Sequence, residues 1–114
     1  MQPTKRQILA DALISSILEQ NPDLTVTVWD WGDYLIENSR DKKAIVDTLE
    51  GPQLILIYNG EQKLGFIETN FGEKVHVNDT VQDHSGTPVI REILQRTGDA
   101  YRENKIKILY PETA

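Results

Sequence analysis

The sequence predicts an α+β protein, with three helices packed on an antiparallel sheet of three to five strands centred on a hairpin at residues 53–70. Two runs of branched and aromatic residues flank a turn at Asn59–Gly60, which is a strong hairpin signal. Residues 9–18 and 90–101 repeat apolar side chains at helical spacing. The length of 114 residues suits one domain spanning 1–114.

The first helix is expected between Thr4 and Asn21. Thr4 is a helix-capping residue, and Gln7 three positions later completes a capping box. The helix should end before Pro22, because the residue before a proline avoids the helical region. On a helical wheel Ile8 alone is out of place, since the other apolar residues fill one half: Leu9, Ala10, Leu13, Ile14, Ile17 and Leu18.

A strand and a second helix are expected before the hairpin. Residues 24–31 are β-branched and aromatic, which favours a strand. The second helix should start at Asn38 or Ser39 and end at Glu50, because Gly51–Pro52 is a stop signal. Its apolar stripe is narrow, so we expect this helix to lie on the protein surface.

The first strand of the hairpin is apolar on both sides, since four apolar residues follow one another from Leu54 to Ile57. Such a strand belongs in the middle of a sheet, with at least part of each face covered. The second helix or a second copy of the chain could cover the face opposite the other helices, so a homodimer is one expectation. Apolar matching favours a four-residue loop, Asn59–Gln62, that pairs Ile57 with Leu64 and Ile55 with Phe66.

The remaining part of the chain should add edge strands and the third helix. An edge strand is expected at residues 74–78, followed by a polar loop at 79–87. The third helix should begin at Thr87, a capping residue followed by proline at the first helical position. Gly98 should end or bend it, since glycine costs about 1 kcal/mol relative to alanine there. Alternation at residues 106–110 predicts a last edge strand.

Composition narrows the classes of function. The chain has no cysteine, which excludes disulfides and thiolate metal sites and suits a reducing compartment. Its net charge of −6 argues against non-specific binding to nucleic acid or to anionic membranes and is compatible with a basic protein partner. No segment has the length and hydropathy of a membrane span or a signal peptide, so the cytoplasm is the expected location. Acidic, cysteine-free chains of this size are common among accessory proteins of phages and mobile elements.

An aromatic and acidic segment is the leading candidate for function. Between Glu19 and Glu50 the chain has eight acidic and three basic residues. Aromatic residues ringed by carboxylates are typical of a surface that engages a basic protein. We therefore expect a non-catalytic binding protein, an inhibitor or adaptor that occupies a surface of a macromolecular partner and needs no cofactor. The contact residues would be Trp29, Asp30, Trp31, Asp33, Tyr34 and Glu37, and Leu35 lies among them. In the competing interpretation the tryptophans are core residues and the acids are ordinary solvated charges.

A metal-dependent hydrolase or nuclease is the second hypothesis. Both histidines of the chain lie in one polar stretch with two aspartates, and imidazole with carboxylate suits Zn²⁺, Mn²⁺ or Fe²⁺. The candidate ligands are His76, Asp79, Asp83 and His84, whose spacing matches no established motif, and a solvated loop is the alternative. A related arrangement would combine Asp30 with Glu61 and Lys63, which match the Glu-x-Lys element of one nuclease class.

Nucleic-acid binding is the third hypothesis. Residues 91–107 contain five basic and three acidic residues, with tyrosines nearby for stacking on a base. The acids dilute the patch, and no nucleic-acid motif covers it, so the sequence argues against this function more than for it. The candidate contacts are Arg91, Arg96, Arg102, Lys105 and Lys107.

Overall fold

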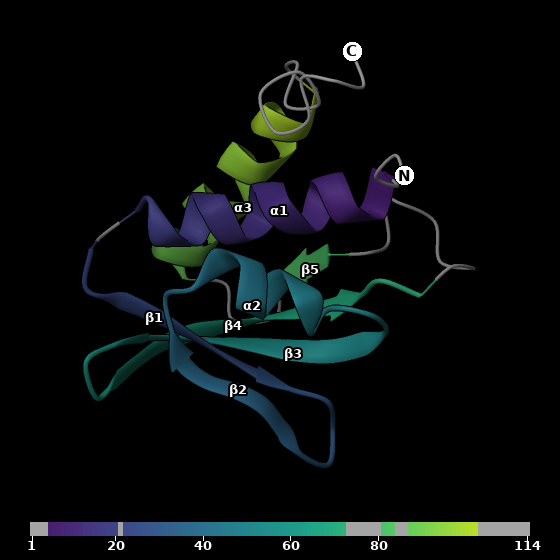
Figure 1. The fold of residues 1–114 in the computed structure, drawn as a ribbon. Helices are drawn as coiled ribbons and strands as arrows, with labels where there is room; N and C mark the ends of the chain where they lie inside the picture. The colour runs from purple at the N-terminus through teal and green to yellow at the C-terminus, as the bar shows by residue number, and fades with distance from the viewer. Residues whose placement is uncertain (1–4, 21, 73–80, 84–86, 103–114) are drawn as a thin grey trace.

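A computed structural model describes residues 5–20, 22–72, 81–83 and 87–102 of the chain (Figure 1). The elements are α1 (Lys5–Leu18), β1 (Leu24–Trp29), β2 (Tyr34–Ser39), α2 (Lys42–Asp47), β3 (Pro52–Asn59), β4 (Gln62–Asn70), β5 (Val81–Asp83) and α3 (Pro88–Arg102). The strands form one antiparallel sheet in the order β2-β1-β3-β4-β5. The predicted α+β class, with three helices and a sheet centred on the hairpin, is confirmed. In the described part of the chain, no helix combines the length and apolar character that a membrane span requires.

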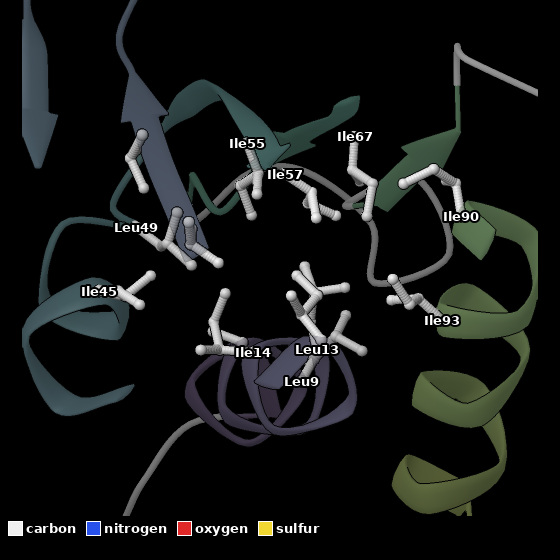
Figure 2. Close-up of a cluster of buried hydrophobic side chains, with 14 of the residues drawn as sticks. Leu9, Leu13, Ile14, Ile45, Leu49, Ile55, Ile57, Ile67, Ile90 and Ile93 are labelled. Carbon is white, nitrogen blue, oxygen red and sulfur yellow. The ribbon is translucent and has the colours of Figure 1, made fainter. Parts of the chain in front are cut away.

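The three helices lie together on one face of the sheet, with α1 between α2 and α3 (Figure 1). The core fills the space between this helical layer and the sheet. Ile55, Ile57 and Ile67 project from the central strands toward α1, as Figure 2 shows. Ile45 of α2 and Ile93 of α3 close the core on its two sides, and both are completely buried. Burial of this apolar surface is the main force that holds the helices on the sheet.

Helix α1 is buried on more sides than its wheel predicts. Ile8, which the wheel leaves out of place, is buried, and so are Ala12, Ser15 and Ser16. A helix in the middle of a layer has neighbours on both flanks as well as the sheet beneath it, so it needs no wide polar face. The hydroxyl of Ser16 donates to the carbonyl of Ala12 at 2.8 Å, which satisfies its hydrogen-bonding requirement inside the layer.

Residues 34–39 form strand β2, which the sequence analysis missed. The strand is exposed or half-buried at every position, because it lies at the edge of the sheet. The predicted second helix is correspondingly shorter. Helix α2 starts at Lys42, after Asp41, whose carboxylate caps it by accepting from the backbone N–H of Ala44 at 3.2 Å. It packs beside α1 with Ile45 buried, so the expectation that it covers the second face of the sheet is wrong.

The hairpin has a two-residue turn, so the predicted four-residue loop is wrong. Gly60 and Glu61 are its central residues, and Gly60 has a φ of 63°, a conformation that glycine adopts without strain. A bulge at Leu64 adds one residue to β4, because Ile57 lies opposite Gly65 while Tyr58 lies opposite Lys63. As a result Ile55 pairs with Ile67 and Leu56 with Phe66, in place of the predicted pairs Ile57–Leu64 and Ile55–Phe66.

The last described elements depart from prediction in two places. Residues 81–83 form β5, opposite Ile67–Thr69, where a polar loop was expected. Helix α3 begins at Pro88 as predicted, and the hydroxyl of Thr87 caps it by accepting from the N–H of Ile90 at 3.3 Å. The helix continues through Gly98 instead of ending there. The strands predicted at 74–78 and 106–110 lie outside the described residues.

Arg40 ties the end of β2 to the connection between α1 and β1. Its guanidinium donates to the carbonyl of Leu18 at 3.2 Å and also to the carbonyl of Leu24. Leu18 is the last residue of α1, and carbonyls at a helix end have no partner within the helix. A cation at this end also interacts favourably with the helix dipole.

Replacing Arg40 with methionine should lower the free energy of unfolding by about 1–2 kcal/mol, because charged hydrogen bonds to two backbone carbonyls are lost. Methionine keeps most of the apolar stem, so packing is nearly unchanged. Urea denaturation followed by circular dichroism measures the difference. The matched control is Lys43→Met, an exposed cation of α2, which should change stability by less than about 0.5 kcal/mol. Equal stability of the two variants would show that Arg40 contributes nothing to the fold.

Candidate partner-binding surface

The turn between β1 and β2 is shaped by its own aspartate. Trp31 and Gly32 are the central residues, and the N–H of Asp30 donates to the carbonyl of Asp33 at 3.1 Å. The carboxylate of Asp30 accepts from the N–H groups of Gly32 and Asp33, at 3.2 and 2.7 Å. An aspartate that accepts from the backbone just after it is a common turn device. Asp30 therefore has a structural role in the turn, which the other two predicted contact carboxylates, Asp33 and Glu37, do not share.

Trp31 holds an unusual backbone conformation. Its φ is 73°, in the left-handed region that bulky residues rarely occupy. This conformation costs about 1–2 kcal/mol for a residue with a Cβ atom. The neighbouring Gly32, which would adopt it freely, does not have a φ in this range. The turn thus carries tryptophan at a position where glycine would be less strained.

The exposed apolar side chains gather at this turn. The indole rings of Trp29 and Trp31 pack against each other with centroids 4.9 Å apart and planes tilted by 54°. Tyr34 lies opposite Trp29 across the strand pair, and Leu35 follows it at a bulge. Among the described residues, the large hydrophobic residues that remain exposed are Trp31 at 49%, Tyr34 at 57% and Leu35 at 42%. We call Trp29, Trp31, Tyr34 and Leu35 the aromatic tip. The interpretation of Trp31 as a core residue is wrong, whereas Trp29 is half-buried.

The aromatic tip continues into the face of the sheet that carries no described helix (Figure 1). Ile55 and Ile57 point into the core, so alternation places Leu54, Leu56 and Tyr58 on the opposite face. Trp29 lies opposite Leu54 in the β1–β3 pairing. No described helix lies on this second face, yet Leu56 and its pairing partner Thr27 are buried there, so part of each face is covered, as predicted. The homodimer remains a prediction.

Two exposed carboxylates accompany the aromatic tip. Asp33 ends the turn, and Glu37 lies four residues further along the chain, in β2. The side chains of both are exposed, and neither makes a hydrogen bond or ion pair with another described residue. Two negative charges beside an aromatic surface favour an approaching group of positive charge. The sequence analysis found these residues through their composition, but it could not find the strain at Trp31, because a turn conformation leaves no signal when the residue is not glycine.

The metal-site hypothesis lies largely beyond the described part of the chain. His76, Asp79 and His84 are outside the described residues, and so is the side chain of Asp83, whose backbone lies opposite Ile67 at the end of β5. Across residues 5–20, 22–72, 81–83 and 87–102, no group of three histidine, cysteine, aspartate or glutamate residues is arranged to hold a metal ion. The hydrolase therefore stays a prediction.

The related arrangement of Asp30 with Glu61 and Lys63 is wrong. Asp30 follows Trp29, which lies opposite Leu54, whereas the turn containing Glu61 follows Asn59 at the other end of β3. Leu54 and Asn59 are five positions apart along β3, which at about 3.3 Å per residue is roughly 17 Å. Figure 1 shows the two turns at opposite ends of the sheet. Carboxylates that share one metal ion must lie within a few ångströms of each other.

The basic C-terminal stretch is only partly described. Arg96 on α3 already interacts with the end of α1, because it donates to the side-chain oxygen of Gln20 at 2.8 Å and lies 3.9 Å from the carboxylate of Glu19. Arg91 is five positions away on the same helix, so the two arginines do not share one helical face. The side chain of Arg102, together with Lys105 and Lys107, lies outside the described residues. The nucleic-acid hypothesis stays a prediction.

No protein-family model, no curated protein and no solved structure matches this chain. Function must therefore be argued from the arrangement of its own residues.

Proposed function

We propose that this protein is a non-catalytic binding protein that occupies a surface of a basic macromolecular partner, most simply another protein, through the aromatic tip. It would act as an inhibitor or an adaptor, as accessory proteins of phages and mobile elements do. We include the cytoplasm in the proposal, since a chain without cysteine suits a reducing compartment.

The observation that carries the proposal is the clustering of exposed apolar residues. Trp31, Tyr34 and Leu35 lie within five consecutive positions, and elsewhere in the described chain no large hydrophobic residue is comparably exposed. Tryptophan and tyrosine dominate the binding energy of protein interfaces because they bury large areas with few rotatable bonds. Asp33 and Glu37 would form the charged rim, which steers a basic partner and makes the association sensitive to salt.

The first test is a pull-down of tagged protein from host lysate, read by mass spectrometry and followed by calorimetric titration of the purified partner. We expect one stoichiometric basic partner that the wild-type protein retains and that binds more weakly as the salt concentration rises. Loss of the same partner in a Tyr34→Ala variant that stays folded would assign the contact to the aromatic tip. A partner that Tyr34→Ala binds with unchanged affinity would contradict the proposal.

A pair of charge variants tests the rim. Asp33→Asn should weaken partner binding by about fivefold, or about 1 kcal/mol, because a rim charge contributes little more than that. Glu61→Gln changes the net charge equally but lies at the far end of the sheet, so the affinity should stay unchanged. Titration calorimetry at low salt measures both. If the two variants weaken binding equally, the overall charge of the protein is responsible and the tip has no particular role.

A further inference from the structure

We infer that the aromatic tip binds an arginine side chain of the partner, with the guanidinium stacked on the indole pair of Trp29 and Trp31 and within reach of the Asp33 carboxylate. This inference rests on the proposed function and specifies the chemistry of its central contact. It follows from the ring geometry, from the carboxylates beside the rings and from the conformation of Trp31.

The ring pair leaves a face for a cation. The two indoles are tilted by 54° with centroids 4.9 Å apart, so they contact each other without stacking face to face. Trp31 remains 49% exposed, which leaves much of its ring surface accessible. The face of an indole carries partial negative charge and is the best aromatic partner for a cation in proteins. A cation is therefore the most favourable occupant of this surface.

The carboxylates select the kind of group that occupies the tip. An apolar group would remove water from Asp33 and Glu37 without giving either a partner, which is costly for a charge. A guanidinium is planar, so it can stack on an indole and at the same time donate to a carboxylate. The ammonium of lysine is compact and strongly hydrated, so it satisfies only one of these contacts well.

The turn backbone fixes the direction of the Trp31 side chain, and the contact with Trp29 restrains its ring before binding. A residue in the left-handed region, held by the hydrogen bonds that Asp30 makes around the turn, has little freedom to rearrange. A ring that is already in place loses little conformational entropy when the arginine arrives. The proposed contact with arginine thus gives a reason for the strained backbone of the exposed Trp31.

The test uses the full chain and a small probe, N-acetyl-arginine methylamide, whose only charge is the guanidinium. The chain has two tryptophans, so an ¹⁵N-correlated NMR spectrum shows two indole N–H signals. We expect both signals to shift and to reach half-saturation at a probe concentration on the order of 10 mM, as a single cationic side chain would. The matched citrulline derivative is neutral and of the same shape, and should shift both signals at least about fivefold less at the same concentration. The Asp33→Asn variant should need a higher arginine concentration.

The outcomes of this test distinguish a failure of the arginine inference from a failure of the proposed function. Equal shifts with arginine and citrulline, or equal shifts with arginine and the corresponding lysine derivative, would overturn it. No shift with arginine, in a protein whose partner binding is still lost on Tyr34→Ala, would overturn the inference and leave the proposed function standing. Conversely, arginine binding at the indoles together with a partner that Tyr34→Ala does not affect would remove the proposed function.

Discussion

Replacing Trp31 with glycine should abolish partner binding while leaving the fold as stable as before or more stable. Glycine adopts a φ of 73° without the cost of about 1–2 kcal/mol that a larger residue incurs. The loss of the ring contact with Trp29 offsets about 0.5–1.5 kcal/mol of this gain. Partner affinity should fall by at least about 30-fold, or about 2 kcal/mol, which is the effect of removing a central interface aromatic. Thermal unfolding and titration calorimetry on the same preparation measure both quantities.

The neighbouring glycine provides the control for this variant. A Cβ atom at Gly32 would have the carboxylate oxygen of Asp30 as its nearest neighbour, at 3.8 Å, which is ordinary contact. Gly32→Ala should therefore fold and bind as the wild-type protein does. Unfolding of Trp31→Gly would assign the residue to the core, and a stable variant with unchanged partner affinity would show that the ring serves another purpose. A stable variant without binding would show that tryptophan is kept at this position at the expense of stability.

Replacing Leu13 with alanine should have the largest effect on the fold. Leu13 is completely buried at the centre of α1, among core residues of the sheet and of the flanking helices (Figure 2). Deleting its side chain should lower the free energy of unfolding by about 3 kcal/mol, through lost burial and the cavity left behind. That is a large part of the 5–15 kcal/mol typical of a protein of this kind. The melting temperature should fall by roughly 10–15 °C.

Leu35→Ala is the matched control for Leu13→Ala, because it removes the same atoms from a residue that is 42% exposed. Its stability should change by no more than about 0.5 kcal/mol. Similar losses for the two leucines would mean that the tip is packed as tightly as the core, which would contradict its assignment as a free surface. A Leu35 variant that is stable but binds the partner weakly would extend the contact along β2.

The elements that could be predicted from sequence are those in which one local signal dominates. Helix α3 has a capping threonine, a proline at its first position and apolar residues at helical spacing, so its start was correctly assigned. Strand β2 gives no such signal, because an edge strand needs no buried face and its exposed residues show no alternation. The register of the hairpin failed for another reason. The bulge at Leu64 places Ile67 opposite Ile55, and both side chains lie in the core with Ile57. Pairwise matching along two strands does not include this packing against the helices.

The candidate site also has features that could be predicted from the sequence and features that could not. The composition of residues 29–37 was enough to bring together Trp31, Tyr34 and the nearby carboxylates. Their exposure was not predictable, because an aromatic strand is equally consistent with the core. The distance between Asp30 and Glu61 could not be predicted either, because it depends on how the strands are ordered and paired in the sheet. The left-handed backbone of Trp31 is a property of the folded turn alone.

The position of α1 has a consequence for how the protein is made. Its apolar surface is covered in part by α3, and 69 residues separate the end of one helix at Leu18 from the start of the other at Pro88. At a synthesis rate of about 5–20 residues per second, roughly 4–14 s pass between the emergence of the two. During this interval the nascent chain exposes a helix segment that is buried on nearly all sides in the finished protein. The chain is therefore expected to need a chaperone or a slow, late collapse on the ribosome, and to gain protease resistance only after α3 has been synthesised.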